Sequence, residues 1–211
     1  MRFWYRVCYA LVRIAFFFWH PVARFEGREQ IPAGSAVICG NHCGAADPLW
    51  VLLALNNPDM IRIIAKKELR DAPVIGWIME RFGIIFVDRG HHDTKAYDRC
   101  VEVLSAGEKL LVFPEGTRCR AGRRVRAKTG AVRMAAASGA PILPVYISTN
   151  RKPFSPVRVI FGQPMTVTLP ENAEHERLQA EADRLMQTIY GLGGEQYAAD
   201  TGEDSGILLR R

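Results

Sequence analysis

The sequence has few cysteines, and their arrangement suggests neither a disulfide framework nor a zinc site. Its 211 residues include five cysteines, an odd number, and none of them form a C-x-x-C pair. Small secreted domains usually pair an even number of cysteines, and structural zinc sites need clusters at characteristic spacings. We therefore expect reduced thiols in a protein that faces the cytosol, and no metal ion.

Acidic residues are absent from the middle of the chain. Between Gly116 and Pro170 there is no Asp or Glu, whereas ten Lys or Arg occur there, and the formal net charge of the whole chain is +6. A concentrated positive field of this kind calls for an anionic partner. Charge alone leaves phosphorylated small molecules, anionic lipid and nucleic acid open.

The N-terminal segment is rich in aromatic and aliphatic residues, but it lacks an apolar run long enough to span a membrane. Its longest stretch without Lys or Arg runs from Ile14 to Ala23, whereas a spanning helix needs ~20 apolar residues. On a helical projection Arg2, Arg6 and Arg13 lie within about 40° of one another. Phe, Trp, Tyr and Leu occupy the other faces, a pattern typical of a helix that lies in the lipid interface.

We predict that residues 1–25 form this membrane-interface segment and attach the protein to the cytoplasmic face of the cell membrane, as a peripheral or monotopic protein. The segment favours a lipid surface over nucleic acid as the anionic partner. The alternative is a core helix whose arginines face solvent. A secretory signal peptide is disfavoured because no small-residue cleavage site follows the apolar stretch.

Short apolar runs alternate with helical patterns along the rest of the chain. Runs bounded by Gly, Pro or charge predict strands at 35–40, 61–66, 83–88, 109–114, 142–148 and 157–162. Helical patterns occupy 48–57, 73–81, 94–106, 127–138 and 174–192. This alternation predicts one α/β domain over residues 26–192, with a mostly parallel central sheet flanked by helices. The segment 193–211 has little apolar content, so we expect it to be a mobile tail.

Three polar clusters follow predicted strands at their carboxyl ends. His42 and Asp47 follow the first strand, "DRG" (88–90) follows the third, and "PEGTR" (114–118) follows the fourth. Ligands of open α/β sheets bind beyond the carboxyl ends of the strands. We therefore expect the three clusters to converge on one site.

His42 and Asp47 are five positions apart, a separation that no helix or strand period brings together. In a loop, Asp47 could accept a hydrogen bond from one ring nitrogen and leave the other nitrogen as a general base. Gly44 and Ala45 are small and would let the chain fold back. The alternative is that Asp47 only caps the helix that begins at Pro48, beside a buried histidine.

Two other kinds of site are disfavoured. A zinc site formed by His42 and Asp47 with Cys39 and Cys43 would use a cysteine from an apolar strand, and no second Cys/His cluster of the usual spacing exists. A serine hydrolase would need a G-x-S-x-G elbow, which the sequence lacks. The nucleophile that His42 activates must then come from the substrate.

Cationic side chains near the same edge suit a phosphate group. Arg89 and Arg118 offer planar guanidinium groups that match a phosphate monoester, and Lys128 adds a point charge. Each of them, taken singly, would more often be a solvated surface cation. Glu115 directly follows a buried strand, so we expect it to join a polar network or to bind a substrate hydroxyl.

Four sequence blocks resemble those of the phospholipid/glycerol acyltransferase family. "NHCGAAD", "GIIFVDRG", "VFPEGTR" and "APILPVYI" occur in the order of the family's four blocks. The resemblance is strongest to the 1-acylglycerol-3-phosphate (lysophosphatidic acid) acyltransferases, and it covers roughly residues 20–165. Four blocks in the correct order are far more specific than any single motif.

The resemblance implies a role for each block. It implies that His42 deprotonates an acceptor hydroxyl while Asp47 orients the imidazole. It implies that the glycerol phosphate is held by Arg89 and Lys128 and by four residues of "PEGTR", namely Glu115, Gly116, Thr117 and Arg118. It links the fourth block to the acyl donor through the region around two prolines, Pro141 and Pro144.

The reaction that the resemblance implies moves a fatty acyl group from acyl-CoA or acyl-ACP to 1-acylglycerol-3-phosphate and gives phosphatidic acid. It uses no metal or redox cofactor, and acyl carrier protein is an expected partner if it is the donor. One alternative is another lysolipid or an amino-lipid as acceptor. An alternative from a different class is a non-enzymatic protein that binds anionic lipid or nucleic acid through the basic segment 118–133.

Overall fold

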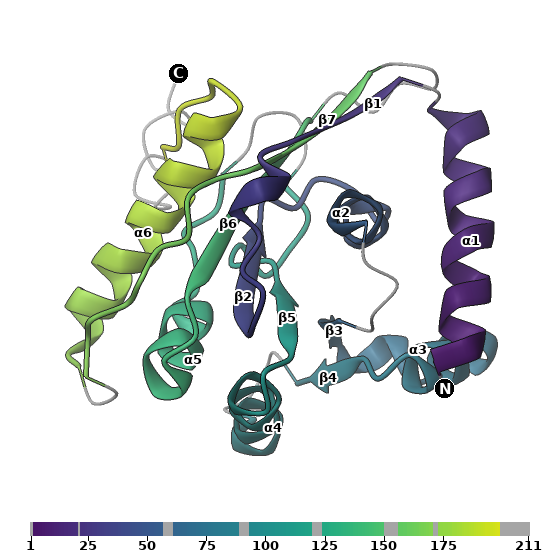
Figure 1. Ribbon diagram of the computed structural model, residues 1–211. Coiled ribbons are helices and arrows are strands. Elements are labelled where there is room, and N and C mark those ends of the chain that lie inside the picture. The colour runs from purple at the N-terminus through teal and green to yellow at the C-terminus, as the bar shows by residue number, and fades with distance from the viewer. Residues whose placement is uncertain are drawn as a thin grey trace, which may run out of the picture.

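The computed structural model describes residues 2–20, 22–56, 61–88, 93–119, 124–149, 156–170 and 173–198. In this part of the chain seven strands form one sheet in the order β1-β7-β6-β2-β5-β3-β4 (Figure 1). They are β1 (Ala23–Glu26), β2 (Ala36–Gly40), β3 (Arg62–Lys66), β4 (Ile85–Val87), β5 (Lys109–Val112), β6 (Ile142–Ile147) and β7 (Val157–Phe161). Neighbouring strands are parallel except β6 and β7, so β1 and β7 run against the other five.

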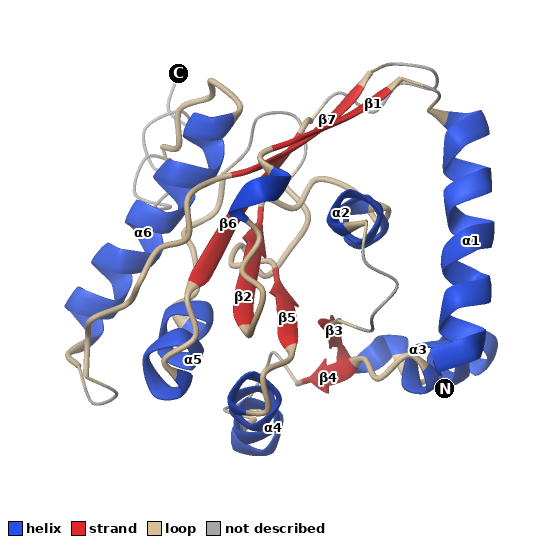
Figure 2. Cartoon of the chain, viewed as in Figure 1, coloured by secondary structure: helices blue, strands red, loops and turns tan. Residues whose placement is uncertain are grey.

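Helices cover both faces of the sheet (Figure 2). They are α1 (Arg2–Trp19), α2 (Asp47–Leu55), α3 (Pro73–Arg81), α4 (Thr94–Ser105), α5 (Gly130–Ser138) and α6 (His175–Leu192), with two short 3₁₀ helices, η1 (Arg28–Gln30) and η2 (Lys67–Leu69). The chain folds as a single α/β domain with a mostly parallel sheet, so the predicted fold class is confirmed.

The central strand β2 is buried at every position, because both of its faces are covered. Val37 and Cys39 pack in one apolar cluster with α4, α5 and α6. Ile38 packs in a second cluster with α2 and with Phe16 of α1. Side chains of a strand alternate between the two faces, so this continuous apolar run contributes to both clusters. Packing on both faces holds β2 in place, and with it the start of the polar loop that follows Gly40.

The structure adds detail at both predicted boundaries of the domain. The predicted N-terminal segment, 1–25, contains α1 and also the first residues of β1, which pairs with β7 through Ala23 and Val157. The described start of the predicted tail, 193–198, is packed on the domain: the Tyr197 hydroxyl donates to the Val125 carbonyl at 2.9 Å. Residues 199–211 lie outside the described residues, and their mobility stays a prediction.

Helix α1 has two apolar faces. On the inner face Phe16 is buried, and its ring lies 4.6 Å from the ring of Trp50 in α2. On the outer face several large apolar side chains are exposed: Leu11 (61%), Ile14 (57%), Phe17 (62%) and Phe18 (71%). We call these four side chains the outer face of α1. Within the described residues, no helix has the length and apolar character needed to cross a membrane.

Candidate active site

His42 and Asp47 form a side-chain pair at the carboxyl end of β2. Nδ1 of His42 lies 2.9 Å from Oδ2 of Asp47. The chain between them turns back on itself, because the Asp47 N–H donates to the Gly44 carbonyl at 3.2 Å. Asp47 is fully buried, whereas the His42 side chain is 16% exposed. The buried carboxylate therefore orients the imidazole, and part of the ring remains accessible to solvent.

Asp47 does not cap α2. The helix begins at Asp47 itself, and its N-cap residue, Ala46, makes no side-chain cap bond. The Asp47 carboxylate instead points back to the loop, where Oδ2 accepts the backbone N–H groups of Cys43 (2.7 Å) and Gly44 (2.8 Å). The cap alternative is therefore wrong. A carboxylate oxygen accepts hydrogen bonds, so in the neutral imidazole Nδ1 of His42 carries the proton and Nε2 keeps an unprotonated lone pair.

The segment that follows β5 makes three contacts with His42, one with the ring and two with the backbone. The ring of Phe113 stacks on the imidazole, with the centroids 4.2 Å apart and 21° between the planes. Oε2 of Glu115 accepts the His42 backbone N–H at 2.6 Å. The Cys119 N–H donates to the His42 carbonyl at 2.7 Å. The clusters that follow β2 and β5 thus converge as expected, because parallel neighbours end at the same edge of the sheet.

Glu115 links this loop to α6. It is 2% exposed, and the Tyr190 hydroxyl donates to its Oε1 at 2.6 Å. Burial raises the pKa of Glu115, while hydrogen bonds from Tyr190 and from the His42 N–H act in the opposite direction. Of the two expectations for Glu115, the polar network is what the structure shows. Its contact with a substrate stays a prediction.

The last three residues of "PEGTR", Gly116, Thr117 and Arg118, form a turn between Glu115 and Cys119, the two residues that contact the His42 backbone. Gly116 has a φ of +66°, a left-handed conformation that favours glycine. A Cβ atom at this position would lie 2.9 Å from Cε of Lys128. The Lys128 side chain therefore passes over the turn. Thr117, Arg118 and Lys128 are all exposed, so two cations lie on the surface at the segment that contacts the His42 backbone.

Of the other three predicted site residues, one is not described and two lie in or next to β6. Arg89 falls outside the described residues, so its role stays a prediction. Pro141 comes directly before β6, at the opposite end of the sheet from His42, and its carbonyl accepts the Val37 N–H at 2.9 Å. Pro144 is buried within β6 beside Cys39. Their proposed link to the acyl donor is untested, and these positions indicate a structural contribution to the sheet.

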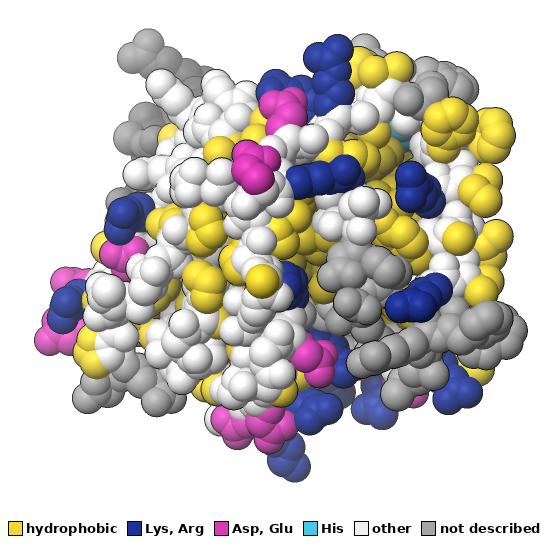
Figure 3. Space-filling model, viewed as in Figure 1, with side chains coloured by type: hydrophobic (Ala, Val, Ile, Leu, Met, Phe, Trp, Pro, Cys, Tyr) yellow, Lys and Arg dark blue, Asp and Glu magenta, His cyan; other side chains and the backbone are white. Residues whose placement is uncertain are grey.

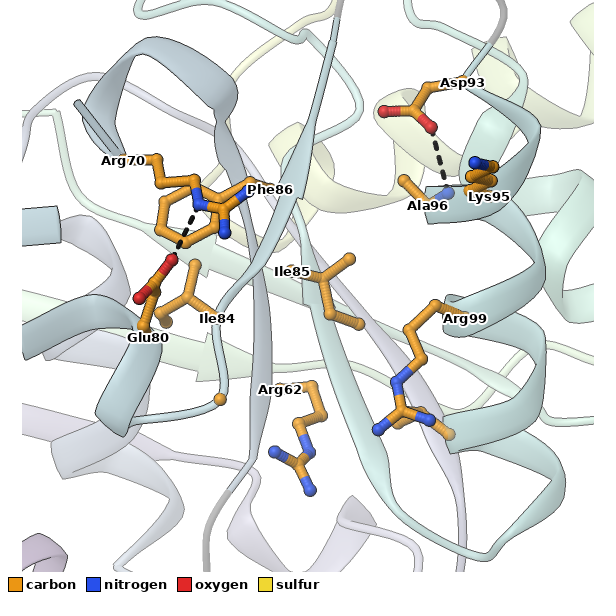
Figure 4. A pocket seen from close by; sticks show the side chains of 12 residues that line it. Arg62, Arg70, Glu80, Ile84, Ile85, Phe86, Asp93, Lys95, Ala96 and Arg99 are labelled. Atoms are coloured by element: carbon orange, nitrogen blue, oxygen red, sulfur yellow. Dashed lines mark hydrogen bonds and ion pairs between the residues drawn. The ribbon is translucent and has the colours of Figure 1, made fainter. Parts of the chain in front are cut away.

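A pocket of about 430 Å³ lies along the edge strand β4 (Figure 4). Its charged lining residues are Arg62, Arg70, Lys95, Arg99, Glu80 and Asp93. Its three arginines are ion-paired: Nε of Arg70 lies 2.7 Å from Glu80, Nε of Arg62 lies 2.7 Å from Glu108, and Nη1 of Arg99 lies 3.0 Å from Glu102. Strand β4 is the third neighbour from β2, which separates the strands by about 14 Å. The pocket is therefore distinct from the His42 site.

The cysteines near His42 do not form a metal site in the described part of the chain, where no three potential ligands come together. Cys39 is buried in β2, and burial raises the pKa of its thiol. A thiol must lose its proton to bind zinc. This environment therefore opposes the zinc alternative.

Several residues of the site were not predicted from the sequence. Asn41 is fully buried, and its side chain exchanges two hydrogen bonds with the backbone of Ile147, at 2.7 and 2.8 Å. It thereby joins the start of the loop to the end of β6. Asn41 belongs to the block "NHCGAAD" and Phe113 to the block "VFPEGTR". Their place in these blocks is the feature of the sequence that could have marked them as site residues. Tyr190 is distant in sequence from Glu115. The apolar periodicity of α6 predicts that Tyr190 is buried, but it does not distinguish Tyr190 from the other core residues of that helix.

A histidine that a buried aspartate orients is an arrangement suited to general base catalysis. The chain belongs to the Acyltransferase family, whose model matches residues 22–148. The curated relatives include a 1-acyl-sn-glycerol-3-phosphate acyltransferase of Borreliella burgdorferi, 34% identical over 67% of this chain and 56% of its own length. The protein of the same name in Bacillus subtilis is 30% identical over 77% of this chain and 83% of its own.

Two further comparisons bear on specificity and fold. A lyso-ornithine lipid O-acyltransferase of Pseudomonas aeruginosa is 36% identical over 58% of this chain and 46% of its own length. The crystal structure of the 1-acyl-sn-glycerophosphate acyltransferase PlsC from Thermotoga maritima superposes with a TM-score of 0.61 and 25% identity, over 84% of this chain and 74% of that one. This chain spans little more than half of the Borreliella relative and 36% of a chloroplast relative from Arabidopsis thaliana.

Proposed function

We propose that the protein transfers a fatty acyl group from a thioester to the free hydroxyl of 1-acylglycerol-3-phosphate and releases phosphatidic acid. The observation that carries this proposal is the His42–Asp47 pair at 2.9 Å. Among the described residues the loop offers no serine nucleophile next to His42, and the family supplies the reaction class. The attacking oxygen is then the acceptor's own hydroxyl.

The proposed reaction needs a single proton relay. Nε2 of His42 takes the hydroxyl proton while the oxygen attacks the thioester carbonyl, and the imidazolium then gives the proton to the departing thiolate. The buried Asp47 carboxylate stabilises the imidazolium through Nδ1. Base catalysis of this kind typically contributes ~10²–10⁴-fold. The donor, acyl-CoA or acyl-ACP, is a co-substrate, and the scheme assigns no role to a metal or redox cofactor.

The exposed cations beside His42 support a phosphate-bearing acceptor. Arg118 lies in the segment in which Phe113 stacks on the imidazole and Glu115 accepts the His42 backbone N–H, and the Lys128 side chain passes over Gly116 of the same segment. A guanidinium binds a phosphate monoester in a bidentate manner. The Pseudomonas relative favours a second candidate acceptor, a lyso-ornithine lipid. The two acceptors differ in the phosphate group, so the cations distinguish them.

Replacing Arg118 with alanine should chiefly impair the use of the phosphorylated acceptor. A hydrogen bond to a charged group contributes roughly 1.5–3 kcal/mol, so kcat/KM for 1-acylglycerol-3-phosphate should fall by roughly 10–150-fold. The measurement compares this acceptor with monoacylglycerol and with lyso-ornithine lipid, and product masses identify each transfer. Arg133→Ala, which removes an exposed cation from α5, is the control. An equal loss with all three acceptors would contradict phosphate recognition by Arg118.

We also propose that the protein acts at the cytoplasmic face of the cell membrane, with the outer face of α1 in the lipid interface. The outer face exposes aromatic and aliphatic side chains, and Arg6 and Arg13 are exposed beside it on the same helix. Such helices bind by apolar burial together with attraction to anionic lipid. The inner face is already used, because Tyr5 and Phe16 are buried.

Changing Leu11, Ile14 and Phe18 together to serine should move the protein from vesicles of anionic phospholipid to the soluble fraction. These side chains are largely exposed, so their loss should leave the unfolding temperature nearly unchanged. The effect is measured by co-sedimentation with vesicles. Deleting residues 1–20 is a less specific test, because it also uncovers Trp50. If the triple variant sediments as fully as the parent protein, the outer face of α1 is not the membrane contact.

A further inference from the structure

A second pocket, of about 310 Å³, lies between α1, β1 and the C-terminal end of α2. Figure 3 shows an apolar hollow beside α1, with Lys and Arg side chains at its rim. The apolar lining residues come from three elements and are Phe16, Phe17, Ala23, Phe25, Trp50 and Leu53. This volume is at the lower end of the range for small-molecule pockets, roughly 300–1,000 Å³. It suffices for part of one lipid chain.

The charged groups of this pocket, unlike those along β4, are of one sign. Arg13 and Arg28 line it, and none of the described lining residues is acidic. Arg28 is fixed in place, because its Nε donates to the Ala54 carbonyl at 2.7 Å and its guanidinium lies 4.8 Å from the centre of the Phe25 ring. Arg13 is exposed on α1. An apolar floor under two arginines is complementary to an amphiphile with one anionic group.

The pocket connects to the surface that faces lipid in the proposed orientation. Phe17 lines the pocket and is also 62% exposed on the outer face of α1. A lipid chain could therefore enter along α1 from the bilayer without crossing water. Asp47 begins α2, whereas Leu53 and Asn56 line the pocket at the other end of that helix. At about 1.5 Å per residue, Leu53 and Asn56 lie roughly 9–14 Å along the axis of α2 from Asp47, and Trp50, which also lines the pocket, lies roughly 5 Å from it.

We propose that this pocket binds an anionic phospholipid of the membrane, with the phosphate between Arg13 and Arg28 and the first part of an acyl chain on Phe16, Phe25 and Trp50. The site is separate from the His42 pair, and the bound lipid is not the molecule that reacts there. Its occupation would hold α1 at a fixed distance from the bilayer surface. Binding requires no acyl donor, so it is measured independently of acyl transfer.

The test uses dihexanoyl phosphatidylglycerol, an anionic phospholipid that is neither substrate nor product of the proposed reaction. It is used below the concentration at which it forms micelles, because monomers exclude general attachment to a bilayer. We expect saturable binding by calorimetry with one lipid in this pocket. Arg13→Gln should weaken it about tenfold, the effect of one charge-assisted contact. Ala23→Phe, which fills the pocket from β1, should abolish it. Dihexanoyl phosphatidylcholine, which carries no net charge, should bind about tenfold more weakly than the phosphatidylglycerol.

Two matched controls locate the bound lipid. Arg6→Gln removes an exposed cation from the same helix but not from the pocket, and should bind like the parent protein. Arg118→Gln removes a cation from the turn beside His42 and should also bind normally. Loss of binding in Arg118→Gln but not in Arg13→Gln would place the lipid at His42 and overturn the proposal. Equal binding by Arg13→Gln, Ala23→Phe and the parent protein would overturn it as well, provided that circular dichroism shows all of them folded.

Discussion

Replacing His42 with alanine should lower the rate of acyl transfer by roughly 10²–10⁴-fold, the contribution that general base catalysis usually makes. The backbone contacts of His42 with Glu115 and Cys119 do not involve the imidazole, so the loop should keep its fold. The base acts mainly in the transition state, and lysolipid binding should therefore change little. The measurement is kcat with purified enzyme, together with equilibrium binding of 1-acylglycerol-3-phosphate. A kcat within a few-fold of the parent value would exclude His42 as the base.

The substitution Asp47→Asn separates the two roles of Asp47, which are to hold the loop by accepting backbone N–H groups and to stabilise the charged imidazole of His42. The amide oxygen can still accept the N–H groups of Cys43 and Gly44, so the loop should remain closed. The negative charge that stabilises the imidazolium is lost, and kcat should fall by about 10²-fold or more. Asp47→Ala would also leave two buried N–H groups unsatisfied, at about 1–3 kcal/mol each. A folded Asp47→Asn enzyme with normal turnover would mean that Asp47 only holds the loop.

The fold could be predicted because its signals are local. Continuous apolar runs such as 36–40 and 142–147 are typical of strands with both faces covered, and both are fully buried. Strand β1 was missed because "ARFE" has only four residues, and its pairing with β7 joins positions far apart in the sequence. The start of α5 was placed three residues early, at 127, because Ala127 is buried in a loop that Tyr197 and Gln179 hold by hydrogen bonds.

The candidate site was predicted only in part, since its chemistry depends on how loops close. The sequence left open whether Asp47 is a cap or a partner of His42. The choice rests on the turn at Gly44, which no periodicity encodes. Glu115 was predicted as polar and near the site. That it contacts the His42 backbone, and that Tyr190 supports it, follows from the packing of α6 on the sheet and could not be inferred from local sequence.

The contact between Glu115 and Tyr190 leads to the second large expected effect. Glu115→Gln places an amide where a carboxylate accepts both the His42 N–H and the Tyr190 O–H. An amide has one acceptor oxygen, so it can satisfy only one of these buried donors well. The His42 backbone should become less ordered, and kcat should fall by roughly 5–150-fold, the equivalent of 1–3 kcal/mol for one buried unsatisfied group. If Glu115 acts by positioning His42, KM for the acceptor should change much less. A comparable rise in KM would instead support the predicted contact between Glu115 and the substrate.

Tyr190→Phe tests the same contact through its pH dependence. The Tyr190 hydrogen bond lowers the pKa of Glu115 and so opposes the effect of burial. Without it the pKa should rise further, and Glu115 should become protonated at a higher pH than in the parent enzyme. The low-pH limb of the profile of kcat against pH should then move to higher pH, and kcat should recover as the pH rises. Glu115→Gln has no carboxylate to titrate, so its activity should not recover in this way.

Tyr197→Phe is the matched control for this shift. The Tyr197 ring stacks on Tyr190 with the centroids 5.7 Å apart, but its hydroxyl bonds to the backbone of Val125 and Ala127 rather than to the carboxylate. Its removal should cost some stability and leave the acidic limb of kcat in place. If Tyr190→Phe keeps the pH profile of the parent enzyme while both variants unfold at similar temperatures, Tyr190 only packs α6 against the sheet. The pKa of Glu115 would then be set by burial, which raises it, and by the His42 N–H and Cys119, which lower it.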